Sequence, residues 1–234
     1  PDEKWTALGA TAYKEDTAVF SVSITGSKTS ILNLPVKDSI GSCTITPDAE
    51  KENSGVGANR PNSDGSATDQ DKYLTDPVPE GKPLPVEPEN QEVNKGKTYT
   101  CTFSIECSTI LNNLSELDPD KLELVPSNGV ILAPTTVTFY EGESVFDVLQ
   151  RVCEERGIHM EAEWTPIYNS AYVEGIHNLY EFDCGALSGW MYKVNGWYPN
   201  YGSSRYQLKD GDVVEWRFTC DLGNDIGGGY AVGG

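Results

Sequence analysis

Aromatic side chains are concentrated in residues 188–206, which read SGWMYKVNGWYPNYGSSRY in an otherwise polar and acidic chain. Trp190, Tyr192 and Val194 alternate along a predicted strand, so one aromatic face is expected to belong to a core. The rings after the Asn195–Gly196 turn lie in a loop, where they could contact a flat or apolar ligand, a sugar or another protein. The alternative is a satellite cluster that packs over the edge of a sheet.

A second candidate segment is the long loop predicted over residues 168–182, because long loops on compact domains are frequently functional. Both segments together supply the predicted ligand-binding residues: Tyr168, Tyr172, Trp190, Tyr192, Trp197, Tyr198, Tyr201 and Tyr206. The enzymatic alternative would use His177 with Glu174, or Cys184 as a nucleophile. A thiol nucleophile needs an adjacent base and a third orienting group. The chain also lacks the common hydrolase, phosphate-loop, dinucleotide and zinc-protease motifs, so we expect no enzyme.

Oxygen-bearing side chains lie close together near the C-terminus, in CDLGNDIG. Asp221, Asn224 and Asp225 are the kind of hard ligands that calcium prefers. Their spacing differs from that of an EF-hand loop, and a polar turn is the alternative interpretation. We expect no required cofactor, and calcium at these three residues is the metal hypothesis.

The balance of charges excludes several partners. Thirty-six acidic and seventeen basic residues give a net charge of −19, which argues against nucleic acid and against an anionic membrane surface. No apolar run approaches the ~20 residues that span a bilayer, so we do not expect an integral membrane protein. An even number of cysteines, six, in a loop-rich acidic chain is typical of an oxidising compartment. The lack of a C-x-x-C pair argues against a structural zinc site. The chain begins with Pro and shows no signal peptide, which we interpret as a trimmed fragment of an exported protein.

Composition divides the chain into four parts. Residues 1–46 hold a predicted strand at 18–24 with a partner at 42–46, and residues 47–97 are a predicted Pro-, Gly- and acid-rich linker. Residues 98–227 are the predicted main domain, and residues 228–234 a flexible Gly-rich tail. Because 46 residues rarely make a core alone, a second module or an envelope partner is expected to pack on the first part.

The main domain is predicted to be α+β, with one helix that crosses a mixed sheet. The first strand, YTCTFSIEC (99–107), places Cys101, Phe103, Ile105 and Cys107 on one face. The helix is predicted over 141–157, with Ser144 as N-cap and Gly157 as the stop. Further strands are predicted at 135–140, 159–164, 179–184, 190–200 (a hairpin) and 213–220. This order predicts a β-grasp, or ubiquitin-like, arrangement in which the first and last strands are central neighbours, so that Cys107 and Cys220 lie near the same end.

Several motifs resemble one known domain when they are taken together. They are EGESVFDVLQRV (141–152), TPIYNSAYVEGIHNLYEFDCG (165–185), GWMYKVNGWYPNYGSSRYQLKDGDVVEWRFT (189–219) and CDLGNDIG (220–227). They resemble a widespread bacterial domain of unknown function that shares its fold with the C-terminal domain of transcobalamin and intrinsic factor. The resemblance covers roughly residues 99–227. Ser203 stands where many members of that family carry a cysteine, so any bridge through that cysteine is lost.

The resemblance implies an exported or surface-attached protein of a Gram-positive bacterium, and half of a corrinoid site. Residues 1–98 do not look like the helical barrel that covers the other side of the corrinoid in the vitamin carriers. We therefore expect a secreted or cell-surface binding module that captures a small planar or apolar ligand, with cobalamin as the implied ligand. The alternative is an adhesion or scaffold domain that binds a surface protein or a glycan.

Overall fold

The computed structural model describes residues 17–24, 28–35 and 71–231. The chain divides into two compact units, Pro1–Ser54 and Gly55–Gly234. In the first unit, β1 (Thr17–Ile24) pairs antiparallel with β2 (Lys28–Pro35). The strand predicted at 18–24 is therefore present, but it pairs with β2. The predicted partner at 42–46 lies outside the described residues.

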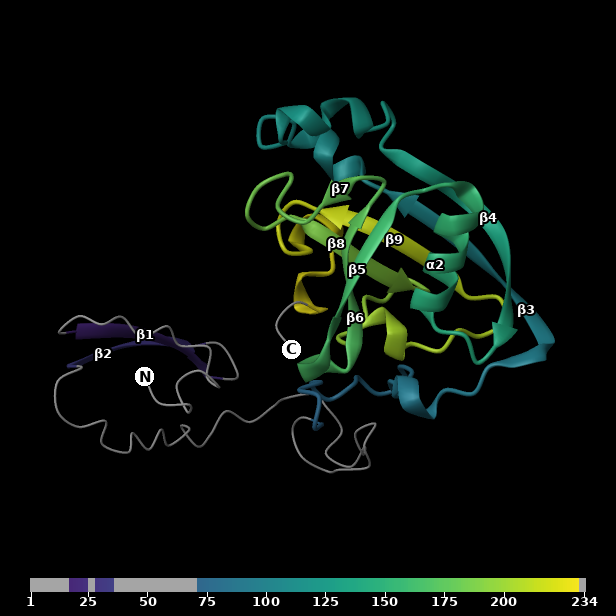
Figure 1. The fold of residues 1–234 in the computed structure, drawn as a ribbon, viewed down its shortest axis with the longest axis horizontal. Coiled ribbons are helices and arrows are strands. Elements are labelled where there is room, and N and C mark those ends of the chain that lie inside the picture. Colours follow the sequence, from purple (N-terminus) through teal and green to yellow (C-terminus); the bar gives the residue numbers. More distant parts are fainter. Residues whose placement is uncertain (1–16, 25–27, 36–70, 232–234) are drawn as a thin grey trace. The chain divides into compact units, whose positions relative to one another are not determined.

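The second unit is built on a four-stranded sheet with the order β4-β3-β9-β8 (Figure 1). Its strands are β3 (Asn94–Glu106), β4 (Val130–Glu141), β8 (Gly189–Val194) and β9 (Val213–Thr219). The central strands β3 and β9 are parallel, and the two outer pairs are antiparallel. The predicted central pairing of the first and last strands is confirmed, whereas the β-grasp label stays a prediction.

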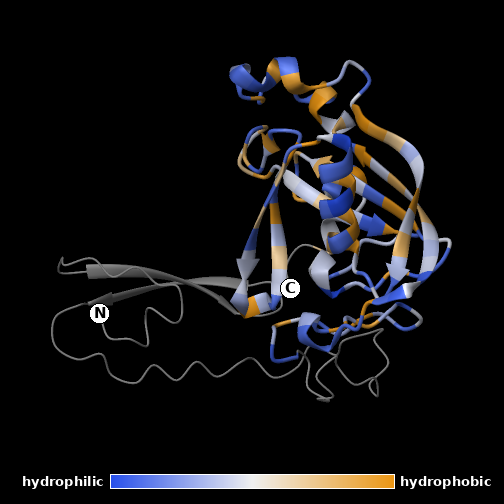
Figure 2. Ribbon diagram, turned by 45° about the vertical axis from the view of Figure 1, so that its right-hand side comes forward, coloured by the Kyte–Doolittle hydropathy of each residue, from blue (hydrophilic) through white to orange (hydrophobic). Residues whose placement is uncertain are grey.

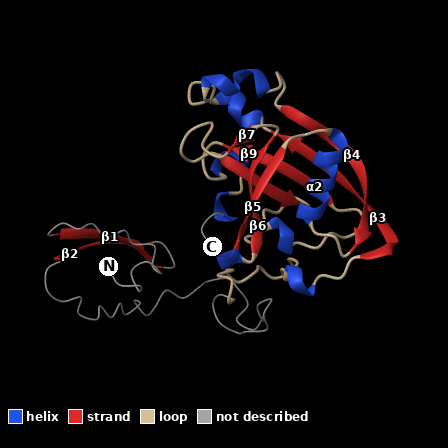
Figure 3. Cartoon of the chain, in the orientation of Figure 1, coloured by secondary structure: helices blue, strands red, loops and turns tan. Residues whose placement is uncertain are grey.

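One α-helix of the described residues, α2 (Val145–Arg156), packs across this sheet (Figure 3). It begins with the predicted cap, because the Ser144 hydroxyl accepts from the Asp147 backbone N–H and the Asp147 carboxylate accepts from the Ser144 N–H. It ends at Gly157, whose φ of 64° is the left-handed conformation that glycine adopts without a steric penalty. The α+β class with one main helix is confirmed.

The core lies between α2 and the sheet. Hydrophobic and hydrophilic residues alternate along the strands (Figure 2), as the period of two requires. The buried positions are those expected from this pattern: Cys101, Phe103 and Ile105 of β3, Val214, Trp216 and Phe218 of β9, and Val145, Val148, Leu149, Val152 and Cys153 of α2. Burial of each large side chain contributes about 1.5–3 kcal/mol, so this interface holds the unit together.

A smaller sheet, in the order β5-β6-β7, lies on the same unit (Figure 1). Its antiparallel strands are β5 (Met160–Thr165), β6 (Ser170–Ile176) and β7 (Leu179–Tyr180). The loop predicted over 168–182 is therefore wrong. Ala171, Val173 and Gly175 are buried on one face of β6. Two of these three residues are small and the segment contains several polar residues, so its sequence resembles that of a loop. The strand predicted at 179–184 stops at Tyr180.

Residues 71–93, called the strap below, fall within the segment predicted to be a linker, yet they pack on the second unit. Val78 is buried in the core cluster, and the Val86 N–H donates to the Arg205 carbonyl at 2.8 Å. The Pro-rich composition does favour extended backbone, but an extended segment can still be covered and hydrogen-bonded by a neighbouring domain.

Short 3₁₀ helices connect these elements. They are Pro88–Asn90, Ser108–Asn112, Pro119–Leu124, Pro166–Tyr168, Ser203–Arg205, Asn224–Ile226 and Gly229–Ala231. The last of them lies within the stretch predicted to be a flexible tail. No helix of the described residues is long and apolar enough to cross a membrane.

Candidate functional site

The aromatic loop, defined as residues 197–206, does not present its rings to solvent. Trp197 and Tyr201 are each 7% exposed, and Tyr198 and Tyr206 are buried even further. The prediction that these rings form a ligand-binding surface is therefore wrong for the described structure. The alternative interpretation, a satellite cluster over the sheet edge, is not borne out either, because Trp197, Tyr201 and Tyr206 belong to the main core cluster.

The strap covers this loop. The Tyr201 hydroxyl donates to the Pro83 carbonyl at 2.8 Å, and the Lys82 ammonium lies 5.3 Å from the centre of the Trp197 ring. Tyr201 also stacks on Tyr206 with ring centres 6.1 Å apart. The strap was predicted to be a linker, and the rings of Trp197 and Tyr201 were predicted to be exposed. Both predictions are wrong for the same reason, because the strap packs over these two rings.

Tyr198 is covered from another side, by the C-terminal turn. Its hydroxyl donates to the Ile226 carbonyl at 3.1 Å, and its N–H donates to the Tyr230 hydroxyl at 3.0 Å. A Cβ on Gly228 would lie 2.8 Å from the Tyr198 ring, so this close approach requires glycine. Burial raises the pKa of the Tyr198 hydroxyl.

Trp190 and Tyr192 of β8 belong to the core, as their alternation predicted, and are not available to a ligand. The Trp190 Nε1–H donates to the Leu179 carbonyl at 2.8 Å, and the Tyr192 hydroxyl donates to the Tyr201 carbonyl at 2.7 Å. Both polar tips are therefore satisfied inside the protein, which is the condition for burying such rings. Burial raises the pKa of Tyr192 well above its ordinary value.

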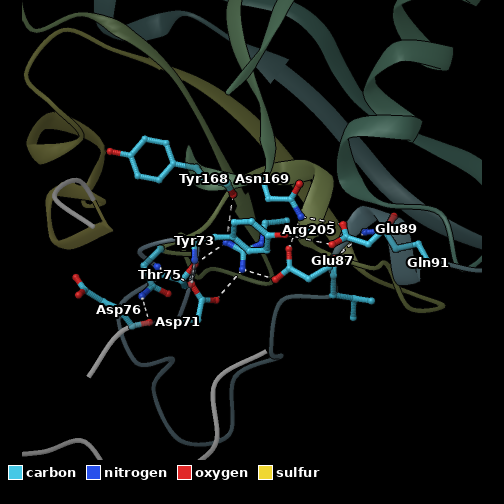
Figure 4. A network of polar contacts seen from close by, with 12 residues as sticks. Asp71, Tyr73, Thr75, Asp76, Glu87, Glu89, Gln91, Tyr168, Asn169 and Arg205 are labelled. Atoms are coloured by element: carbon cyan, nitrogen blue, oxygen red, sulfur yellow. Dashed lines mark hydrogen bonds and ion pairs between the residues drawn. The ribbon is translucent and has the colours of Figure 1, made fainter. Parts of the chain in front are cut away.

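Arg205 fastens the strap to the domain. Its side chain is 1% exposed, and its guanidinium pairs with the Asp71 carboxylate at 2.8 Å and with the Glu87 carboxylate at 2.6 Å. Figure 4 shows the two strap carboxylates reaching the same guanidinium. The guanidinium carbon of Arg205 lies 5.5 Å from the centre of the Tyr73 ring. Buried charges are retained where they are paired in this way, so the arrangement is structural.

Exposed hydrophobic residues gather instead at the end of the β5–β6 hairpin. Four side chains between residues 164 and 172 are exposed: Trp164 (47%), Ile167 (57%), Tyr168 (41%) and Tyr172 (47%). We call these four residues the hairpin tip. The Tyr168 carbonyl faces Arg205 at 3.5 Å, while its ring points away from the polar network (Figure 4). Of the eight predicted ligand-binding residues, Tyr168 and Tyr172 are thus the two that remain accessible.

Acidic groups accompany the hairpin tip. The Tyr172 hydroxyl donates to the Glu181 carboxylate, and Glu163 lies opposite Tyr172 in the register. The Asn169 amide donates to the carboxylates of Glu87 at 2.7 Å and Glu89 at 2.9 Å. The hydrogen bond from Asn169 is the largest of the effects that lower the pKa of Glu89. The surface therefore combines apolar area with negative charge.

The three predicted calcium ligands do not converge on a cation site. Asp225 uses both carboxylate oxygens within its own turn, one toward the Thr219 hydroxyl and one toward the Cys220 N–H at 2.8 Å. In residues 71–231 no group of three or more His, Cys, Asp or Glu side chains is placed to hold a metal. The geometry supports the alternative interpretation of this segment, a polar turn.

The groups proposed for an enzymatic alternative are not arranged as nucleophile and base. Burial raises the pKa of Cys184, whereas a reactive thiol needs a lowered one. The Cys184 thiol faces the Asn113 carbonyl at 3.5 Å. His177 lies in the turn after β6 with a φ of 58°, and its N–H donates to the His159 carbonyl at 2.7 Å.

An open groove lies at another edge of the unit, with a volume of about 820 Å³. It is lined by Tyr99, Glu141, Gln207 and Lys209 among others. The Lys97 ammonium bonds the Glu141 carboxylate at 2.6 Å, and the Tyr99 hydroxyl donates to the same carboxylate at 3.1 Å. The groove therefore combines charged and polar groups with apolar side chains, including the Tyr99 ring, Val93 and Leu208.

A family model described as a domain of unknown function, DUF4430, matches residues 142–220. This match lies inside the region 99–227 and confirms a resemblance to a domain of unknown function over these residues, whereas the relation to the C-terminal domain of transcobalamin stays a prediction. A comparison with curated proteins finds no match.

Solved structures with a similar arrangement include haptocorrin in complex with Cbi, at 15% identity and a TM-score of 0.41. That similarity covers 56% of this chain and 27% of the haptocorrin chain, so this chain spans about a quarter of haptocorrin. Another is a "putative metal binding protein" from Ruminococcus gnavus, at 14% identity and a TM-score of 0.30, covering 53% of this chain and 96% of that one.

Sequence reasoning missed the residues that decide which surface is accessible. Arg205 and its strap partners Asp71 and Glu87 are far apart in the chain, and no local pattern joins them. Trp164 and Ile167 could have been noticed, because they flank Pro166 between two predicted β segments, where a turn raises side chains out of a sheet.

Proposed function

We propose that the protein is a non-enzymatic binding module of an exported, cell-surface protein, and that it binds a protein or glycan partner through the hairpin tip. The observation that carries the proposal is the exposure of four large apolar side chains within one short hairpin. Exposed apolar patches with a polar surround are typical of interaction sites, and aromatic residues dominate the energy of such contacts.

This surface suits a protein or a glycan better than a small molecule that must be enclosed by a pocket. The rings that could have enclosed a planar ligand, in the aromatic loop, are buried under the strap. The hairpin tip lies at the end of the β5–β6 hairpin and offers exposed rings with hydroxyl groups at Tyr168 and Tyr172. Tyrosines of this kind pair an apolar ring with a polar end, which suits both glycans and proteins.

Export and the lack of enzymatic activity rest on the sequence. The cysteine count and the family resemblance favour an exported protein. The sequence also lacks the common hydrolase, phosphate-loop, dinucleotide and zinc-protease motifs.

The test is binding of the full chain to arrays of host proteins and glycans, with Trp164→Ala/Tyr168→Ala as the disabled variant. Leu122→Ala is the matched control, because Leu122 is also exposed, at 55%, but lies on the Pro119–Leu124 segment. We expect the double variant to lose at least tenfold in affinity and the control to bind as the parent does. Equal binding by all three proteins would contradict the proposal.

A small planar ligand such as cobalamin is the second candidate, and the open groove beside Tyr99 favours it. Its volume falls in the range of about 300–1,000 Å³ that ligand sites occupy. Titration with cobalamin, followed by the absorbance of the corrin, should give a spectral shift that Tyr99→Ala removes. No shift, together with no retention on a cobalamin resin, would end this second candidate.

A further inference from the structure

Three cysteines from distant parts of the chain collect at one end of the four-stranded sheet. Cys107 follows β3, Cys184 follows β7, and Cys220 follows β9. Backbone contacts hold the segments of the latter two together, because the Leu222 N–H donates to the Leu187 carbonyl at 2.9 Å. The Cys184 N–H is fixed in turn by the Ser188 hydroxyl at 3.1 Å.

Two of these thiols lie close together. The backbone bond between Leu222 and Leu187 holds their segments side by side, and each of the Cys184 and Cys220 side chains affects the pKa of the other. Cys184 is 1% exposed and Cys220 is partly exposed, so the pair joins an inner sulfur to one that solvent reaches. Burial, and then the contact with Cys184, raise the pKa of Cys220 to about 12. The same contact acts against the effect of burial on the pKa of Cys184.

We propose that Cys184 and Cys220 form an intramolecular disulfide when the protein meets a small-molecule disulfide oxidant. The reaction is thiol–disulfide exchange. The raised pKa of Cys220 leaves only a small thiolate fraction at neutral pH, so the exchange is slow and becomes faster as the pH rises. The partly exposed Cys220 thiolate attacks the oxidant, forms a mixed disulfide and releases one thiolate. The Cys184 thiolate then attacks the Cys220 sulfur, forms the new S–S bond and releases the second thiolate. Two protein thiols are oxidised, one oxidant disulfide is reduced, and each released thiolate takes up one of the two protons.

Cys107 is the competing partner, and the structure disfavours it. Cys220 lies near enough to raise the pKa of Cys107. Cys107 and Cys184 are both buried in the core cluster, but Cys107 directly follows the central strand β3, whereas Cys184 lies in the turn after β7. The backbone of Cys107 is also held, since its N–H donates to the Gly129 carbonyl at 2.7 Å. A bond from Cys107 would require movement of a central strand within a packed core, whereas the segment that contains Cys184 is already hydrogen-bonded to the segment that follows Cys220.

The disulfide would join the turn after β7 to the end of β9. Between these residues lie β8, the aromatic loop and β9 itself, so the bond would close a long loop around the buried rings. Cross-links that close long loops reduce the freedom of the unfolded chain most strongly. This inference does not depend on the proposed partner surface, because the hairpin tip lies outside the closed loop.

The test uses the full chain with Cys43→Ser, so that Cys43 cannot exchange. The protein is incubated with glutathione disulfide, free thiols are alkylated, and the digest is mapped without reduction. We expect one cross-linked peptide pair that joins Cys184 to Cys220. Cys153→Ala is the matched control, because Cys153 lies on α2 and should leave this link unchanged.

Stability provides the second readout. Oxidised protein should melt about 10 °C above reduced protein, from the loop length and the size of the domain. Cys184→Ala and Cys220→Ala should each remove that difference while both remain folded. A link between Cys107 and Cys220, or complete alkylation of Cys184 and Cys220 after oxidation, would overturn the proposal.

Discussion

The aromatic loop and the hairpin tip have similar compositions and opposite exposures. Trp197 is 7% exposed and Trp164 is 47% exposed, although both follow or precede a turn at the end of a strand. The first is covered by the strap, and the second stands on an edge strand that no described element covers. An aromatic residue that lies in a turn can be buried or exposed, so its position in the sequence alone predicts neither its burial nor a role in binding. What decides its exposure is whether a distant segment is fastened over it.

The ion pairs of Arg205 with Asp71 and Glu87 hold the strap over the aromatic loop, so we expect their removal to give the largest loss of stability. Arg205→Met leaves the Asp71 and Glu87 carboxylates buried without their cation, and we expect a loss of about 5 kcal/mol in the free energy of unfolding, the upper end for a broken buried pair. Denaturant unfolding measures the loss, and proteolysis should then cut within the strap.

Arg151→Met is the control for this prediction. Arg151 pairs with Glu143 at 2.9 Å, but it is much more exposed than Arg205, so the cost should stay near 1 kcal/mol. Equal costs for the two variants would mean that the strap is not fastened by Arg205.

Truncation of two tryptophans compares the regions directly. Trp197→Ala removes a ring that contacts Tyr201 at 6.0 Å between centres, and it should cost about 4 kcal/mol as a core deletion. Trp164→Ala should cost less than about 1 kcal/mol, because its ring is half exposed. Thermal unfolding of both variants tests this, and a larger effect for Trp164 would reverse the assignment of the two regions.

Alkaline pH should destabilise the buried rings. Burial raises the pKa of Tyr192 and Tyr206 in the folded protein above the ordinary value of about 10. The stability that they contribute is fully present below pH ~10 and is lost as the pH rises above it, because the unfolded chain then releases protons that the folded one keeps. Each ring should contribute a slope of up to about 1.4 kcal/mol per pH unit.

Denaturant unfolding at several alkaline pH values, with phenolate absorbance as the readout, measures that slope. Tyr206→Phe should reduce it by the share of one tyrosine. An unchanged slope in this variant would show that Tyr206 ionises in the folded protein as it does in the unfolded one.

The smallest effect is expected where the two regions meet. Asn169 lies beside the hairpin tip with a φ of 47°, and it bonds the strap carboxylates of Glu87 and Glu89. Asn169→Gly keeps the backbone conformation and removes these bonds, so we expect a loss of about 1 kcal/mol. Asn169→Asp should cost more and respond to salt, because it adds a third carboxylate; equal, salt-independent costs would contradict this role.

The sequence predicted those parts of the fold that depend on local periodicity. Residues only a few positions apart determine the buried faces of β3 and β9. The same is true of the apolar stripe of α2 and of its Ser144 cap. The positive φ values of Asn195 and Gly196, at 50° and 78°, confirm the predicted two-residue turn. The second arm of that hairpin is limited to Trp197, which bridges Val194.

The candidate site was predicted less well, because its exposure depends on contacts between distant residues. Asp71 and Arg205 are separated by most of the domain, and nothing near either residue indicates the other. The strand β6 was missed for a related reason. Its buried face is made of the small residues Ala171 and Gly175 with Val173, which give a weak hydrophobic alternation, and its burial depends on the main sheet behind it.

The parallel pair of β3 and β9 has a consequence for how the chain reaches this state. Thr102 lies opposite Val213 in the register, so the two middle strands are separated by more than a hundred residues. Closing a loop of that length precedes any gain from the contact, which slows folding. A ribosome or a translocation channel must release almost the entire domain before its centre can assemble. We therefore expect the domain to stay unfolded during synthesis and to fold only after it has left the ribosome or the channel.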